Sequence, residues 1–343
     1  MSLSEKWKND NAVYVIAEIG LNHNGSLSMA HDLIDVAAES KVSAVKFQKR
    51  TVSELAIRST LEAPDNRFPL FGSTYGQIRE FLEFDLKEYS ELKSHAEKLN
   101  LDFIVTPFDS LALKFLGDLN LECYKIASHS VTNLNFIKDV AATGKSIIMS
   151  TGMSELAEVE TAVSSLTTLN PDLTLLHCVS SYPTPNSDCN LKVISTLAEK
   201  FKLPIGYSGH EVDFLPTLIA VALGARVIER HITLNNSLDG FDHKLSLDPD
   251  SLKEMVVSIA LVREILGSDQ KNLLPIEMIA RNKYNVSMVS ARNLAIGETL
   301  SEDNICWKNP GTGIPRKRMN DFIGRKLKVP VDIDELLTPE MFA

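Results

Sequence analysis

Eight short apolar segments recur along this chain, and each ends in a polar residue. Each is followed by a stretch whose apolar residues have the spacing of an amphipathic helix. Alternating strands and helices are typical of a parallel sheet, and eight repeats predict a TIM (β/α)8 barrel. The segments are residues 13–20, 44–48, 102–108, 123–128, 146–151, 173–180, 203–209 and 227–233.

The carboxyl ends of the strands carry the active site in such barrels. Here these ends hold two lysines, several hydroxyls, histidines and a carboxylate. Such a set suits an anionic substrate and a divalent metal. The residues are Glu18, Lys46, Gln48, Thr106, Lys125, Ser128, Ser150, His177, Ser180, Ser208, His210 and His231.

The chain of 343 residues is longer than a barrel, which needs about 250. We predict a catalytic barrel over 1–267, a linker with a short helix over 268–285, and a small domain of short strands over 286–343. The small domain has a limited core, so we expect it to pack on another surface, such as a partner subunit. An irregular region over 51–84 is expected to be a functional loop or lid.

Composition excludes some classes of partner. The net charge of −10 argues against a general nucleic-acid binder, although a local basic pocket can still hold a small anion. Four cysteines without a CxxC pair are typical of reduced thiols in a cytosolic protein. No long apolar run precedes the first strand, so we expect neither a signal peptide nor a membrane segment.

His210 and His231 end neighbouring strands of the predicted barrel, where two imidazoles can reach one metal ion. Alternatively, they are polar residues of the barrel mouth that hydrogen-bond to loops. Two histidines do not complete a coordination shell, and Asp242 is a candidate third contact.

Lys46 and Lys125 lie inside apolar strands, where each needs a partner. An anion between them, such as a phosphate or carboxylate, would satisfy both. A structural ion pair with Glu18 or another acid is the alternative, and a Schiff-base lysine is less compatible with the histidine pair. Glu18 could equally act as an acid or base or orient a sugar hydroxyl. The strand-end serines are turn formers or hydroxyl donors to an anion.

Several of these residues fall in motifs with a family resemblance. AEIGLNHNGS, AVKFQKRT, TPFD, YKIAS, STGM, LLHCVSSYPTP, GYSGH and IERHIT occur in the order seen in sialic acid synthases. ARNLAIGE and PGTGI are similar to parts of their C-terminal antifreeze-like (SAF, β-clip) domain. The resemblance covers about residues 13 to 335.

The resemblance implies a TIM barrel with a SAF domain, assembled as a domain-swapped homodimer. Such enzymes condense phosphoenolpyruvate with an N-acylated mannosamine or related hexose, which gives a nine-carbon 2-keto-3-deoxy acid and phosphate. Their metal is manganese or magnesium.

The resemblance also implies residue roles. The catalytic residues are Glu18, Lys46, Lys125 and Asp242, and the metal ligands are His210 and His231. Phosphoenolpyruvate would contact Lys46, Thr106, Lys125, Ser128, Ser150, Ser180 and Ser208. The sugar would contact Gln48, Ser130, Tyr182 and Asp242.

Three positions depart from the family pattern. Ser130 replaces a glutamate expected to contact the sugar, and Ser180 replaces an asparagine. Asn309 replaces a basic residue expected to reach the partner's active site, with Lys308 and Arg316 nearby. This combination predicts the same reaction with an altered acceptor of the legionaminic, pseudaminic or spore-coat type.

Two other readings stay open. One is a different barrel enzyme, such as a metal aldolase or an amidohydrolase, although the HxH motif of amidohydrolases is absent where Asn22-His23-Asn24 stands. The other is a non-catalytic homologue, supported by the changes at Ser130 and Asn309.

Overall fold

The protein divides into two compact units, Met1–Gly267 and Ser268–Ala343. The computed structural model describes residues 3–8, 12–170 and 172–343.

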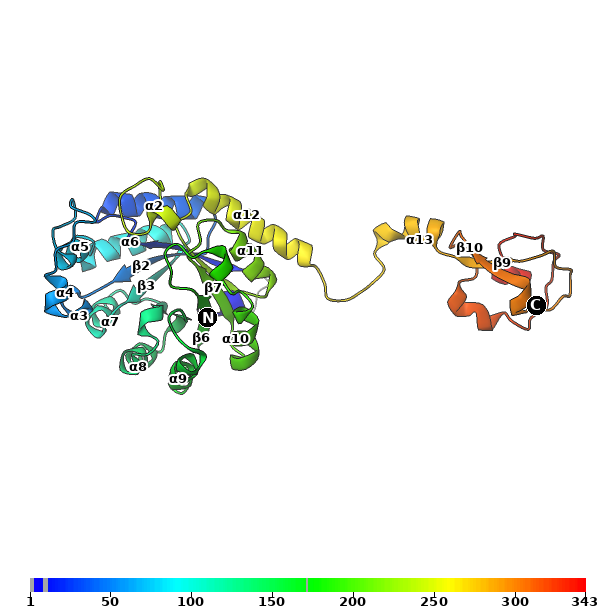
Figure 1. Cartoon of the computed structure of the whole chain (residues 1–343), viewed down its shortest axis with the longest axis horizontal. Helices are drawn as coiled ribbons and strands as arrows, with labels where there is room; N and C mark the ends of the chain where they lie inside the picture. Colours follow the sequence, from blue (N-terminus) through cyan, green and yellow to red (C-terminus); the bar gives the residue numbers. More distant parts are fainter. Residues whose placement is uncertain (1–2, 9–11, 171) are drawn as a thin grey trace. The chain divides into compact units, whose positions relative to one another are not determined.

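The first unit is a closed barrel of eight parallel strands in sequence order, which confirms the predicted TIM barrel. Helices surround the strands, as Figure 1 shows. The strands are β1 Tyr14–Gly20, β2 Ala44–Lys49, β3 Asp102–Pro107, β4 Cys123–Ile126, β5 Ser146–Ser150, β6 Leu173–Cys178, β7 Ile205–Gly209 and β8 Val227–His231.

The connecting helices bury one apolar face each against the outside of the strands. Asp85 and Asp109 cap α6 and α7, because each side chain accepts a hydrogen bond from a backbone amide of the first turn. These helices are α2 Leu27–Glu39, α6 Leu86–Lys98, α7 Ser110–Gly117, α8 Leu134–Ala142, α9 Leu156–Thr167, α10 Val193–Phe201, α11 Leu215–Ala222 and α12 Pro249–Leu266. Among the described residues, no helix is long and apolar enough to cross a membrane.

The period of two along each strand builds the barrel interior in layers. An apolar layer closes the lower part and contains Ile16, Ala44, Ile104, Cys123, Ile148, Leu176 and Val227. Two residues further along each of these strands stands a mostly polar layer, made of Glu18, Lys46, Thr106, Lys125, Ser150, Cys178 and Glu229. The apolar layer therefore supports the polar one from below.

The region 51–84 is not wholly irregular, because it contains α3 Val52–Leu55, α4 Arg58–Leu61 and α5 Tyr75–Phe81. Thr74 caps α5 by accepting a hydrogen bond from the amide of Gln77. The whole segment between β2 and α6 is called the β2 insertion below.

A short N-terminal helix, α1 Glu5–Lys8, was not predicted. Its Trp7 is almost fully buried and packs with the apolar layer of the barrel. The indole N–H donates to the Thr174 hydroxyl at 2.9 Å. This contact satisfies the polar atom of a large buried ring.

The second unit has its own core, which includes Met288, Leu294, Phe322 and Phe342. Its β9 Ser287–Ser290 and β10 Ile305–Lys308 pair antiparallel. The helix α13 Met278–Tyr284 belongs to this unit, where the Gly311 amide donates to the Asn282 carbonyl at 2.7 Å. Part of the segment predicted as a linker therefore packs with the small unit.

Candidate active site

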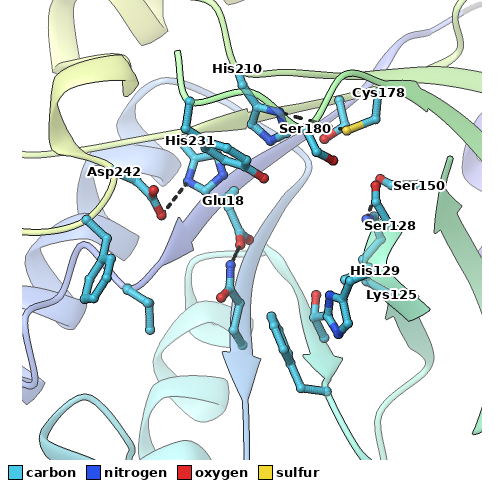
Figure 2. Close-up of a pocket in the computed structure, with 18 of the residues that line it drawn as sticks. Glu18, Lys125, Ser128, His129, Ser150, Cys178, Ser180, His210, His231 and Asp242 are labelled. Carbon is cyan, nitrogen blue, oxygen red and sulfur yellow. Dashed lines mark hydrogen bonds and ion pairs between the residues drawn. The ribbon is translucent and has the colours of Figure 1, made fainter. Parts of the chain in front are cut away.

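A cavity of about 480 Å³ lies at the carboxyl ends of the barrel strands (Figure 2). This volume is typical of small-molecule sites. The cavity brings together all the residues assigned above to donor, metal and acceptor except Ser130. They are Glu18, Lys46, Gln48, Thr106, Lys125, Ser128, Ser150, Ser180, Tyr182, Ser208, His210, His231 and Asp242.

Both lysines pair with one buried carboxylate, that of Glu229. Lys46 Nζ lies 2.6 Å from Glu18 Oε2 and 3.7 Å from Glu229 Oε1. Lys125 Nζ lies 3.7 Å from Glu229 Oε2 and donates to Ser150 Oγ at 2.6 Å. Glu229 thus lies between the two ammonium groups. The structural ion pair that the sequence analysis gave as the alternative role of the lysines is therefore present.

Burial and charge set the protonation of this network. Burial opposes ionisation of Glu229, but the attraction of Lys125 and Lys46 lowers the pKa of its carboxyl to about 2. The pKa of Lys46 is raised, since Glu18 and Glu229 together outweigh the effect of burial. The pKa of Lys125 is lowered by burial and by the charge of Lys46, which exceed the attraction of Glu229. The two lysines of one cavity therefore differ in their surroundings, which favour the charged form of Lys46 and disfavour that of Lys125.

The glycine of the STGM segment makes room for two hydroxyls. A Cβ on Gly152 would lie 2.4 Å from Ser180 Oγ and 2.9 Å from Ser128 Oγ. The Gly152 amide itself donates to Ser128 Oγ at 3.0 Å. The absence of a side chain therefore allows these polar groups to converge on the cavity.

The two histidines lie close together, with ring centroids 5.4 Å apart. His210 Nδ1 lies 2.9 Å from the Val179 carbonyl, which can only accept. Nδ1 therefore carries the proton, and Nε2 keeps its lone pair. His231 Nδ1 is buried without a hydrogen-bond partner and lies 3.7 Å from Asp242 Oδ2, toward which it points in Figure 2.

These features fit a metal in part. Burial lowers the pKa of both imidazoles, so their neutral, ligating forms are present at neutral pH. A histidine whose other ring nitrogen donates to a carbonyl is oriented as metal-binding histidines are. Within the described ranges, no group of three or more His, Cys, Asp or Glu could hold a metal. Water or substrate would have to complete the shell.

Comparison with known proteins identifies the family. The model of the NeuB family matches residues 33–271, and the model of the SAF domain matches residues 285–343. The first match alone spans more than half of the chain.

The chain belongs to the NeuB family.

Relatives of this NeuB-family chain are synthases of sugar acids. The N,N'-diacetyllegionaminic acid synthase of Campylobacter jejuni is 38% identical over 94% of this chain and 98% of its own length. The N-acetylneuraminate-9-phosphate synthase of Homo sapiens is 36% identical over 96% and 92%. A crystal structure of the sialic acid synthetase of Leptospira borgpetersenii has a TM-score of 0.69 at 36% identity and covers 78% of this chain and 90% of that chain. The resemblance to sialic acid synthases and their SAF domain is confirmed.

Ser130 is not brought to the cavity of this NeuB-family chain. It is buried in a short 3-10 helix, Ser128–Ser130, where its amide donates to the Ala127 carbonyl. Its neighbour His129 lines the cavity instead and packs against Phe108 at a tilt, with ring centroids 4.7 Å apart. Burial, with the charges of Arg50 and Lys125, lowers the pKa of His129 to about 4.

Sequence reasoning missed several cavity residues. The sequence pattern could have shown Glu229 and Cys178. Alternate residues of a strand face the same side, so Glu229 faces inward like His231, and Cys178 faces inward like Leu176. The others lie outside the barrel strands, in loops or short helices, and carried no periodic signal; they are Leu21, Arg50, Arg67, Arg79, Phe108, Ala127, His129, Met153 and Phe241.

The basic residues near the departure at Asn309 already have partners within the small unit. Lys308 forms an ion pair with Asp334. The Arg316 guanidinium lies 5.6 Å from the centre of the Trp307 ring.

Proposed function

We propose that this protein condenses phosphoenolpyruvate with the open-chain form of an N-acylated mannosamine or related hexosamine. The products are a nine-carbon 2-keto-3-deoxy sugar acid and phosphate. The observation that carries this proposal is a single cavity in which two buried lysines and several serine hydroxyls face two neutral histidines. The sugar-acid products named for the relatives support the same chemistry.

The donor half of the cavity suits the phosphate and carboxylate of phosphoenolpyruvate. Lys46 and Lys125 supply positive charge, and Ser128, Ser150 and Ser208 supply hydroxyls, with Thr106 and Ser180 beside them. Glu229 lies against both lysines before any substrate arrives. This arrangement is electrostatic preorganisation, because the charges need not reorganise when the reaction begins.

The reaction balances as one water consumed and one phosphate released. C3 of phosphoenolpyruvate forms a bond to the aldehyde carbon of the sugar, and positive charge develops at C2. Water adds to C2, and the C2–O bond to phosphate then breaks, which leaves a ketone. Of the two protons of the water, one ends on the former aldehyde oxygen, which becomes a hydroxyl, and the other leaves with the phosphate. Glu18, buried and within the polar layer, is our candidate to accept the proton of that water.

A divalent metal, Mn²⁺ or Mg²⁺, is part of the proposal. His210 and His231 would hold it, with Asp242 as the nearest carboxylate. Such an ion supplies Lewis-acid polarisation of a carbonyl oxygen.

The acceptor half contains Gln48, Tyr182 and Asp242. Tyr182 packs on His210 with ring centroids 4.1 Å apart, so a sugar bound there would lie beside both histidines. Because Ser130 stands in place of the family's glutamate and is withdrawn from the cavity, we propose an acceptor other than N-acetylmannosamine itself. Legionaminic, pseudaminic and spore-coat-type precursors are the candidates.

We also propose a domain-swapped homodimer that works in the cytoplasm. Exposed apolar side chains support a surface that a partner covers. Val257, Leu261 and Ile265 form an exposed stripe on α12, Ile279 is exposed on α13, and Ile276 is exposed in the 3-10 turn just before α13. Four free cysteines fit a reducing compartment. Mass measurement in solution should give twice the chain mass, and a monomer active at every concentration would contradict the dimer.

The function is tested by phosphate release from phosphoenolpyruvate over a panel of N-acylated hexosamines, with each component omitted in turn. Release should require donor, sugar and metal together, and chelation followed by Mn²⁺ addition should remove and restore it. Release without a sugar would contradict the proposal.

A further inference from the structure

A buried ion pair lies next to the two histidines of the cavity in sequence. Arg230 directly precedes His231, and Glu211 directly follows His210. Arg230 Nη1 donates to Glu211 Oε1 at 3.0 Å, and the exposed fractions of the two side chains are 1% and 0%. Neither residue lines the cavity, so a substrate bound there does not contact the pair.

The period of two along β8 explains why Arg230 points away from the cavity. Glu229 and His231 line the cavity, so the residue between them faces the outside of the barrel. There Arg230 Nη1 donates to Thr217 Oγ1 on α11 at 2.9 Å. The guanidinium therefore lies between the strand and the helix that covers it.

A glycine lets the partner of Arg230 reach it. The register of β7 and β8 pairs Arg230 with Gly209, the residue before His210. A Cβ on Gly209 would lie 2.6 Å and 2.7 Å from the two carboxylate oxygens of Glu211. The missing side chain leaves room for this carboxylate, which also accepts a hydrogen bond from the Tyr207 hydroxyl at 2.9 Å.

Arg230 also binds the backbone of the turn that follows β7. Its Nη2 donates to the Glu211 carbonyl at 2.6 Å, and its Nη1 donates to the Asp213 carbonyl at 3.0 Å. His210 begins this turn, whereas His231 ends β8 beside the guanidinium. One side chain thus connects the two segments that carry the histidines.

Stability alone does not account for this pair. Apolar residues of similar volume often replace a buried ion pair without loss of stability, because two charges need not then be taken out of water. Apolar side chains cannot replace the directional hydrogen bonds of a guanidinium. Two imidazoles that share one ion need a defined separation, and here the ring centroids lie 5.4 Å apart.

We infer that Arg230 and Glu211 are positioning residues, which set the separation and orientation of His210 and His231 for a divalent metal ion. This inference rests on the metal part of the proposed function. Residues that orient metal ligands typically contribute about 10- to 100-fold to metal affinity. Loss of the pair should therefore weaken metal binding and leave the binding of phosphoenolpyruvate intact.

The test measures the Kd for Mn²⁺ in the substrate-free protein, by electron paramagnetic resonance of the free ion. The main variant is Arg230→Met combined with Glu211→Leu, which removes both charges together and so avoids an unpaired buried charge. We expect its Kd for Mn²⁺ to rise about tenfold or more. Its Kd for phosphoenolpyruvate, measured without metal by calorimetry, should equal that of the wild type.

Two further variants separate positioning from charge and from stability. Arg230→Lys keeps the charge but loses the forked donor geometry, so it should also raise the Kd for Mn²⁺. Asn170→Ala is the matched control, because Asn170 is buried, precedes β6 and donates to the Lys145 carbonyl at 2.7 Å. It does not line the cavity, and it should make the protein easier to unfold in urea without changing either Kd.

The outcomes separate this inference from the proposed function. An unchanged Kd for Mn²⁺ in the double variant would overturn the positioning role, as would an equal rise in Asn170→Ala. If the double variant does not fold, an unchanged Kd in Arg230→Lys would overturn it. A wild type that binds no Mn²⁺ would also overturn it, whereas the condensation itself stands or fails by phosphate release from phosphoenolpyruvate and a hexosamine.

Discussion

Lys46 and Glu18 form an ion pair of 2.6 Å in which both side chains are almost completely buried. Strand register places them side by side, because Glu18 on β1 is paired with Lys46 on β2 and with His231 on β8. A buried charge that loses its partner is strongly destabilising. The polar layer that carries the proposed chemistry therefore also affects the free energy of unfolding.

Glu229→Gln should unfold more easily than the wild type. The change removes the carboxylate shared by Lys46 and Lys125, so we expect a loss of about 3 kcal/mol in the free energy of unfolding, measured by urea denaturation. Adding Lys125→Met should recover part of that loss. A single variant as stable as wild type would show that the carboxylate does not hold the network. Glu122→Gln, on an exposed side chain, is the control.

Lys125→Met should reduce kcat/KM for phosphoenolpyruvate by about 100- to 1000-fold. Lys125 is the buried cation bound to Ser150, and removing one such electrostatic contact costs this much in comparable sites. Phosphate release measures the effect. Lys145→Met, whose side chain is partly exposed and pairs with Glu122, should retain full rate. Full activity in the Lys125 variant would refute its assignment to the donor.

Gly152→Ala should raise KM for phosphoenolpyruvate by about tenfold or more. The new methyl group would clash with the Ser180 and Ser128 hydroxyls and displace them from their positions in the cavity. Gly117→Ala introduces the same group where nothing lies within 4 Å and should leave KM unchanged. Equal KM values in the two variants would mean that these hydroxyls do not contact the donor.

Acid should destabilise the protein partly through His23. Burial and the charge of Arg50 lower the pKa of this histidine from 6.5 to about 3, and its Nδ1 accepts a hydrogen bond from the Gly25 amide. Between these values the unfolded chain binds a proton that the folded protein does not, so stability falls as pH falls. The slope is at most about 1.4 kcal/mol per pH unit.

The measurement is urea denaturation of wild type and His23→Gln from pH 8 to pH 3. The variant should show a shallower loss of stability below about pH 6.5 and the same slope above it. Identical slopes at all pH values would exclude His23 as a buried neutral group.

The sequence predicted the barrel and most of the cavity because strands repeat with a period of two and end at one face. Lys46, Lys125, His210 and His231 could be placed by that rule alone. The same rule, applied one step further, would have placed Glu229.

Other features depend on contacts that periodicity does not encode. Arg67 and Arg79 reach the cavity through the path of the β2 insertion and stack on Phe241 from a distant loop. Ser130 is turned away by a 3-10 helix that directs His129 inward, and Trp7 fills the barrel from a four-residue helix. The positions of these side chains depend on tertiary packing, which the spacing of residues in the sequence does not show.

The condensation is tested most directly with phosphoenolpyruvate labelled with ¹⁸O in the bridge between C2 and phosphorus, together with the preferred hexosamine and Mn²⁺. We expect all released phosphate to carry the label, because the C2–O bond breaks, and one nine-carbon keto acid to form per phosphate. Unlabelled phosphate, or phosphate release without the keto acid, would contradict the condensation.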